Sequence, residues 1–206
     1  MGVGATNTLE RVAASMGALI SIRPNFQPSM DIEKGGVLLA LPALLSQGLL
    51  RYTEKFFTLP NGYYGIDSIF LLLALMALAR IKSVEQLRYC VPGEWGKLLG
   101  LDRIPEIKTL REKMGFLAQD NQPAKWNAEL CRDWMEQYSE FETGYYVDGH
   151  VRVYHGSQTQ LPRHFVSREK LCLRATTDYW VNAMDGQPFF LVNKAVDPGL
   201  IKTLKN

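Results

Sequence analysis

The spacing of apolar residues changes at Gly144, and this change limits the possible folds of the 206-residue chain more than any other feature. Before Gly144 apolar residues recur at helical spacing, as at Leu130, Trp134 and Tyr138. After it, residues 145–154 alternate, with valines facing one way and polar side chains facing the other. The sequence therefore predicts an α+β chain in which a helical region precedes the strands.

The same pattern divides the chain into three parts. Residues 1–30 are rich in small and polar residues and predict a flexible N-terminal arm. Residues 31–142 predict an all-helical region, and residues 143–206 predict a strand-rich region that ends in the start of a helix. Besides residues 145–154, strands are expected at 171–184 and 188–194, which gives three strands and one uncovered sheet edge.

Local signals place the helix boundaries and the turns. Ser83 with Gln86 three residues later is a capping-box pattern and predicts a helix start. Pro105 suits a first helical position, and Gly115 is expected to end that helix. Asp185-Gly186 predicts the tight turn of a hairpin between the last two strands.

Composition excludes several classes of protein. Hydrophobic residues form 47% of the chain and charged residues 21%, which is enough for a packed core and excludes overall disorder. Three cysteines far apart in the sequence argue against a disulfide framework and favour a reducing, cytoplasmic location. The longest apolar run, Ile69–Ala79, is shorter than the ~20 residues that a membrane-spanning helix needs.

Asp148 is the candidate that points most directly to chemistry. It interrupts a strand built of tyrosine and valine, although strand interiors disfavour aspartate. One interpretation is a polar residue on the solvent face of an edge strand. The other is a carboxylate held for a divalent metal, with Gly149 beside it allowing a phosphate backbone to approach closely.

Two further sets of residues have possible ligands. The first set consists of His150, His155, His164 and Cys172. These residue types could hold zinc, although their spacing matches no compact zinc pattern. The second could contact DNA phosphates, or could simply be solvated surface charge, and consists of Lys97, Arg103, Lys108, Arg111, Lys113, Arg152, Arg163, Arg168, Lys170 and Arg174.

Three segments resemble insertion-sequence transposases of the DDE class. They are the strand at 145–154, the run from Leu161 to Asn182, and the helical segment from Ser83 to Glu112. The resemblance extends over roughly residues 31–200. It implies a ribonuclease-H-like core in which two aspartates and a glutamate bind Mg²⁺ or Mn²⁺ and catalyse DNA strand cleavage and transfer. Asp148 matches the first aspartate, so the resemblance makes it a catalytic metal ligand.

In that family the second aspartate and the glutamate follow later elements of the core. The sequence ends at Asn206, before those elements. We therefore expect an N-terminal portion of a transposase with an incomplete ribonuclease-H-like sheet, associated with the nucleoid and inactive alone.

The alternatives are a non-catalytic DNA-binding or regulatory fragment and a structural zinc protein. The regulatory fragment would form homo-oligomers, or mixed oligomers with full-length transposase. The zinc protein would be built on the three histidines and Cys172.

Overall fold

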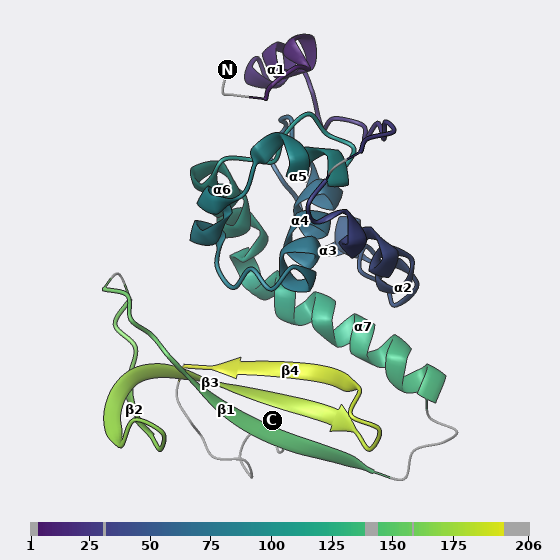
Figure 1. Ribbon diagram of the computed structural model, residues 1–206. Helices are drawn as coiled ribbons and strands as arrows, with labels where there is room; N and C mark the ends of the chain where they lie inside the picture. The colour runs from purple at the N-terminus through teal and green to yellow at the C-terminus, as the bar shows by residue number, and fades with distance from the viewer. Residues whose placement is uncertain (1–3, 31, 139–143, 158, 196–206) are drawn as a thin grey trace. The chain divides into compact units, whose positions relative to one another are not determined.

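The computed structural model describes residues 4–30, 32–138, 144–157 and 159–195 (Figure 1). Their contacts form two compact units, residues 1–126 and residues 127–206. The first unit is helical and the second contains an antiparallel sheet, so the predicted α+β class with helices first is confirmed.

Short helices make up the first unit. In chain order they are α1 (Thr8–Ser15), η1 (Gly35–Ala40), α2 (Leu41–Ser46), α3 (Thr53–Phe56), α4 (Ile66–Leu78), η2 (Val84–Tyr89), α5 (Pro92–Leu98), α6 (Ile107–Leu117) and η3 (Gln119–Asn121).

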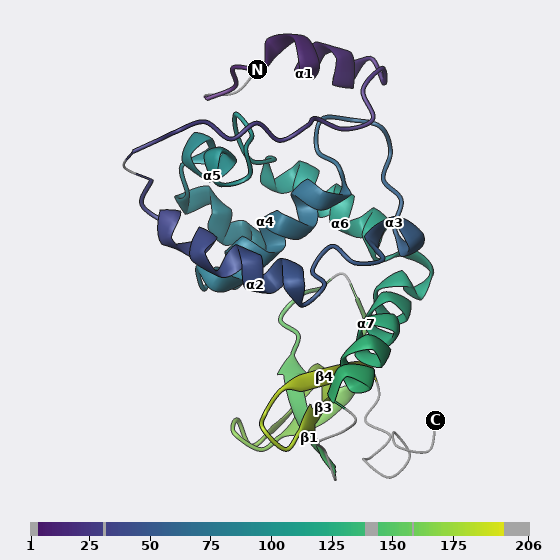
Figure 2. The same cartoon turned by 90° about the vertical axis from the view of Figure 1, so that its right-hand side faces the viewer.

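Helix α4 provides the centre of the first unit, and Figure 2 shows α2, α5 and α6 arranged around it. Its side chains are apolar on nearly every face, and Ile69, Leu72 and Leu75 are almost completely buried. Phe70 packs against Phe57 and Trp126 with ring centroids 5.1 and 5.3 Å apart. A helix that is apolar on nearly every face is expected to be largely buried, and α4 is buried along most of its length, with Leu78 at its end 38% exposed. Among the described residues no helix is long and apolar enough to span a membrane.

Both predicted boundaries of α6 are wrong. The helix begins at Ile107 rather than at Pro105, with Glu106 as its N-cap. Gly115 lies inside α6, which continues to Leu117 because Leu110 and Leu117 are both buried and their packing outweighs the cost of one glycine. The helix start predicted at Ser83 is correct, since a 3-10 helix begins at Val84, but the Ser83 side chain makes no capping hydrogen bond. Gln86 instead accepts the backbone N–H of Lys82 at 2.7 Å.

The second unit contains a four-stranded antiparallel sheet in which β3 (Leu171–Ala183) pairs with each of the other three strands. Its partners are β1 (Tyr145–Val153), β2 (Arg163–Val166) and β4 (Pro188–Lys194). The three predicted strands are therefore present, and β2 is an additional strand. Four residues after a proline are too few to show a clear alternation, which is why the sequence pattern missed it. The helix predicted at 197–206 lies outside the described residues.

The β3–β4 connection follows the predicted hairpin turn. Gly186 has φ +93°, a conformation that glycine adopts without steric cost. The Asp185 carboxylate accepts the backbone N–H of Gln187 at 2.9 Å. This turn fixes the register in which Asp178 lies opposite Asn193.

Helix α7 (Gln122–Tyr138) contributes its second part to the same unit. Cys131 packs in a small apolar cluster with Ala183 and Phe189, and Trp134 and Met135 lie against this cluster. The helix therefore covers an apolar side of the sheet. Polar side chains of the strands lie on the opposite side.

Candidate functional site

Asp148 lies in the middle of β1 with its side chain exposed. It is directly opposite Trp180 of β3, and His150 is opposite Asp178. Because side chains alternate along a strand, Asp148, His150 and Arg152 share one face of the sheet with Asp178. The structure thus places two carboxylates on the same face as diagonal cross-strand neighbours.

Asp178 is already occupied by two partners. The Arg152 guanidinium lies 2.8 Å from Oδ2, and the Asn193 amide donates to Oδ1 at 2.5 Å. The Asp178 side chain is only 4% exposed, whereas that of Arg152 is 66% exposed. Both carboxylate oxygens are therefore used within the sheet, and Asp178 is not free to serve as a second metal ligand.

The described residues supply one carboxylate of a possible metal site, not a complete one. Among them, no group of three or more His, Cys, Asp or Glu side chains is close enough to hold an ion. The three histidines and Cys172 accordingly do not come together as a zinc site. Instead, a ring nitrogen of His164 lies 3.0 Å from the carbonyl oxygen of Ala195.

Gly149 has a packing role in the sheet. It is paired with Tyr179, and a Cβ atom at this glycine would lie 3.2 Å from Cε1 of the tyrosine ring. The ring covers the place where a larger side chain would stand, and it is 4% exposed. Packing of Tyr179 therefore explains the glycine without a phosphate.

Most predicted DNA contacts in the first unit already have partners. Lys97 donates to Ser29 at 3.0 Å, Lys108 lies 4.0 Å from Glu112, and Arg111 pairs with Glu85. Arg103 pairs with Glu106 at 3.0 Å and is only 7% exposed. Lys113 is half-buried, and burial lowers the pKa of its ammonium group.

The predicted contacts on β2, β3 and the turn between them are different. Arg163, Arg168 and Lys170 are exposed, and Arg174 is partly exposed. None of the four forms an ion pair or a side-chain hydrogen bond with any residue in the described parts of the chain. Arg163 lies directly opposite Arg174 in the β2–β3 register. This hairpin therefore has a net positive charge, and its four basic side chains form no ion pair with the described residues.

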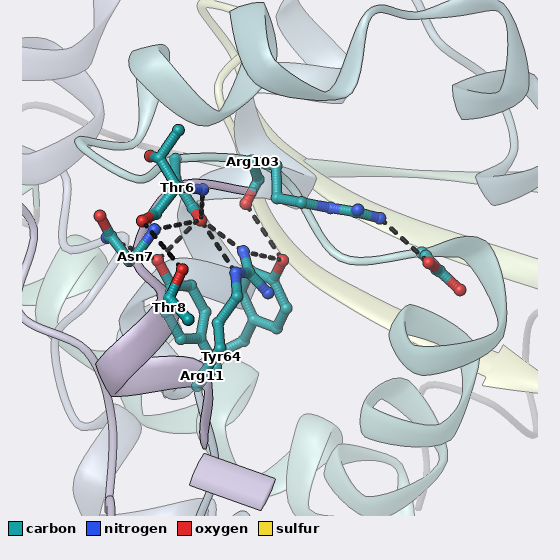
Figure 3. A network of polar contacts seen from close by, with 9 residues as sticks. Thr6, Asn7, Thr8, Arg11, Tyr64 and Arg103 are labelled. Atoms are coloured by element: carbon teal, nitrogen blue, oxygen red, sulfur yellow. Dashed lines mark hydrogen bonds and ion pairs between the residues drawn. The ribbon is translucent and has the colours of Figure 1, made fainter. Parts of the chain in front are cut away.

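Sequence reasoning missed the most extensive polar network in the structure, which is centred on Asp102 (Figure 3). The Asp102 carboxylate accepts the backbone N–H groups of Thr6 and Asn7 at 3.0 and 3.1 Å. It also accepts a hydrogen bond from Nε of Arg11 at 2.8 Å and another from the hydroxyl of Tyr63 at 2.7 Å. This one side chain thus ties the N-terminal segment to the connection between α5 and α6.

The protonation states in this network are fixed by its hydrogen bonds. Burial opposes ionisation of Asp102, but hydrogen bonds from Arg11, Tyr63 and the two backbone amides outweigh it and hold the pKa well below its usual range. Burial also raises the pKa of the Tyr63 hydroxyl, and the hydrogen bond to Asp102 adds to the rise. The carboxylate is therefore charged and Tyr63 neutral near pH 7, which suits a structural lock.

No sequence signal pointed to this lock. Asp102 occupies an ordinary helix connection, and Arg11 lies in the segment that the composition predicts to be an arm. Arg11 is 91 positions from Asp102, and local patterns carry no information about a pair so distant.

Comparison with family models gives a match over nearly the whole sequence. Residues 2–206 match a family described as "Transposase protein". The search of curated proteins and the search of solved structures found no match. Since the matched residues span nearly the whole sequence, the chain belongs to this transposase family.

Proposed function

We propose that the chain acts in DNA transposition, through metal-dependent phosphoryl transfer on DNA, with Asp148 as one ligand of the metal. The observation that carries this proposal is the transposase family match over residues 2–206. The position of Asp148 supports it, because a rigid strand presents the carboxylate to solvent without a competing partner among the described residues. Transposases act on DNA, so DNA is the expected substrate.

The residues of this face have distinct roles in the proposal. Asp148 provides an oxygen ligand of the kind that Mg²⁺ and Mn²⁺ prefer. A bound divalent ion at such a site activates the attacking oxygen and stabilises the leaving oxygen. Because Mg²⁺ sites combine one or two carboxylates with substrate phosphates, phosphate oxygens of the DNA would supply further ligands of the ion. Arg152 neutralises Asp178 and keeps Asp148 as the free carboxylate of the face.

Mn²⁺ binding to the full chain in the presence of DNA tests this role. Free Mn²⁺ is measured by electron paramagnetic resonance for the wild type, for Asp148→Asn and for Asp120→Asn. Asp120 is an exposed carboxylate outside the sheet and serves as the matched control. We expect at least about tenfold weaker binding in Asp148→Asn, because loss of a hydrogen-bond partner of a ligand alone typically costs about 10- to 100-fold in metal affinity. The control should not change.

Plasmid nicking adds a catalytic readout. If the chain nicks DNA with Mg²⁺ and Asp148→Asn does not, the chain has the proposed activity by itself. If Asp148→Asn binds Mn²⁺ as well as the wild type does while DNA binding persists, the metal role is excluded. The chain would then be a non-catalytic DNA-binding protein of the transposase family.

A further inference from the structure

The hairpin formed by β2, β3 and the turn between them, residues 163–174, places two arginines directly across from each other. Arg163 is the register partner of Arg174, and Phe165 is the partner of Cys172. Like charges at directly opposite positions destabilise an antiparallel pair. The described residues provide no carboxylate to relieve this repulsion. An anion from outside the chain, bound between Arg163 and Arg174, would relieve this repulsion.

The four paired positions form one exposed face of the hairpin. Side chains at 163, 165, 172 and 174 point to the same side because the strand period is two. Phe165 is 61% exposed and stands beside both arginines, while Val166 on the opposite side is 8% exposed. The face therefore combines an uncovered aromatic ring with unpaired guanidinium groups. Such a combination is typical of proteins that bind the DNA backbone and stack on bases.

The turn of the hairpin extends the same positive charge. Arg168 and Lys170 lie in the four residues between β2 and β3, with Glu169 as the one acid among them. Within residues 163–174 there are four basic residues and one acidic residue, which gives a net charge of +3. The positive charge therefore extends from the opposed arginines to the tip of the hairpin.

This face is continuous with the face that carries Asp148. Trp180 is the register partner of Asp148 and lies six residues from Arg174 on the same strand. Six is an even number, so both side chains belong to one side of β3. At ~3.3 Å per residue the two positions are at most about 20 Å apart. DNA advances ~3.4 Å per nucleotide, so this distance corresponds to at most about six nucleotides.

We propose that the exposed face of the hairpin at 163–174 is a DNA-binding element. Arg163 and Arg174 hold one backbone phosphate between them, Arg168 and Lys170 contact neighbouring phosphates, and Phe165 stacks on an exposed base. The element holds DNA within about six nucleotides of the phosphate that lies at Asp148. This inference rests on the proposed function, since it takes DNA as the substrate of the same sheet face.

Fluorescence anisotropy with the full chain tests the proposal at several salt concentrations. The probes are a labelled 30-nucleotide single strand of mixed sequence and the corresponding duplex. Arg163→Gln/Arg174→Gln removes the opposed pair, and Lys82→Gln/Lys125→Gln removes the same charge at exposed positions outside the hairpin. Because the pair holds one phosphate, we expect the hairpin variant to reduce the slope of log affinity against log salt concentration by about 0.9 for duplex or about 0.7 for single strand. The control variant should change this slope little.

Phe165→Ala separates stacking from charge. Stacking predicts a loss of affinity for the single strand of about 5- to 150-fold with an unchanged salt dependence, and a smaller loss for the duplex. Equal losses on both probes would instead indicate that the ring contacts paired DNA. Unchanged affinity on both probes would overturn the role assigned to Phe165.

Arg163→Glu distinguishes a loss of DNA binding from a loss of folding. It places opposite charges across the hairpin, so we expect a melting temperature at least as high as that of the wild type together with a loss of DNA binding. Wild-type binding that all three hairpin variants retain would overturn the inference and leave DNA as the substrate. Absence of wild-type binding at low salt would overturn both the inference and the DNA-binding part of the proposed function.

Discussion

Gly96 of α5 lies directly against the backbone of Arg103. A Cβ atom at Gly96 would stand 2.5 Å from the backbone nitrogen of Arg103 and 2.8 Å from the carbonyl carbon of Asp102. The helix and the chain that follows it approach closely because this position has no side chain. The same approach holds the Asp102 carboxylate in place for its contacts with Thr6 and Arg11.

Gly96→Ala should therefore destabilise the protein, although alanine is the better helix former. We expect a loss of about 1–3 kcal/mol in the free energy of unfolding, because overpacking forces the backbone to move. Gly115→Ala is the matched control, since nothing lies within 4 Å of the corresponding Cβ position in α6. This control should raise stability by about 0.5–1 kcal/mol. Urea denaturation of both variants measures the contrast, and equal effects would show that the close approach is unimportant.

Asp102→Asn should weaken the attachment of the N-terminal segment. The Asp102 side chain is 1% exposed and that of Arg11 is 17% exposed, so the substitution leaves a largely buried guanidinium without its counterion. Loss of one partner of such a pair costs about 3 kcal/mol, which urea denaturation would detect. Glu33→Gln is the control, because its ion pair with Lys34 is exposed and contributes less than about 1 kcal/mol. Similar losses in the two variants would contradict the structural role of Asp102.

The same pair predicts how stability depends on pH. The pKa of Asp102 is lower in the folded chain than its ordinary value of 3.8, so its contribution is complete above about pH 4. As the pH falls below 4 toward the folded-state pKa, the unfolded chain binds a proton that the folded chain does not, and the contribution is lost. The difference in unfolding free energy between wild type and Asp102→Asn should be constant from pH 5 to 7 and shrink below pH 4. A difference that grows on acidification would show that the pKa is raised instead.

Arg152 and Asp178 should contribute unequally to the stability of the sheet. Arg152→Gln leaves a buried carboxylate without its cation and should cost about 2 kcal/mol. Asp178→Asn releases an arginine that is already largely in water, so its cost should be below about 1 kcal/mol. The double variant should resemble Asp178→Asn, which a double-mutant cycle by urea denaturation would establish. A larger cost for Asp178→Asn than for Arg152→Gln would reverse this assignment.

The sequence predicted the elements whose signals are local. The alternation around Asp148 and the Asp185-Gly186 turn correctly indicated β1 and the β3–β4 hairpin, because each depends on neighbouring residues. The sequence could not show that Asp178 is held by Arg152 and Asn193, since the register between strands decides those contacts.

The same limit applies to the basic residues. As a group of positive charges they look alike in the sequence, and only their partners distinguish them. Arg111 is paired with Glu85, 26 positions away, whereas Arg163 has no ion-pair partner among the described residues. The roles of Asp148 and of the basic residues remain predictions, which the metal-binding and DNA-binding experiments address.

The attachment of α1 to Asp102 also has a consequence for synthesis of the protein on the ribosome. Helix α1 has eight residues and none of them is buried, so it is too short to be stable by itself. The backbone N–H of Thr6 can form its hydrogen bond only after Asp102, 96 residues later in the chain, has been synthesised. At translation rates of ~5–20 residues per second, that interval is roughly 5–20 s. The first helix to be made is therefore among the last parts of its unit to become fixed.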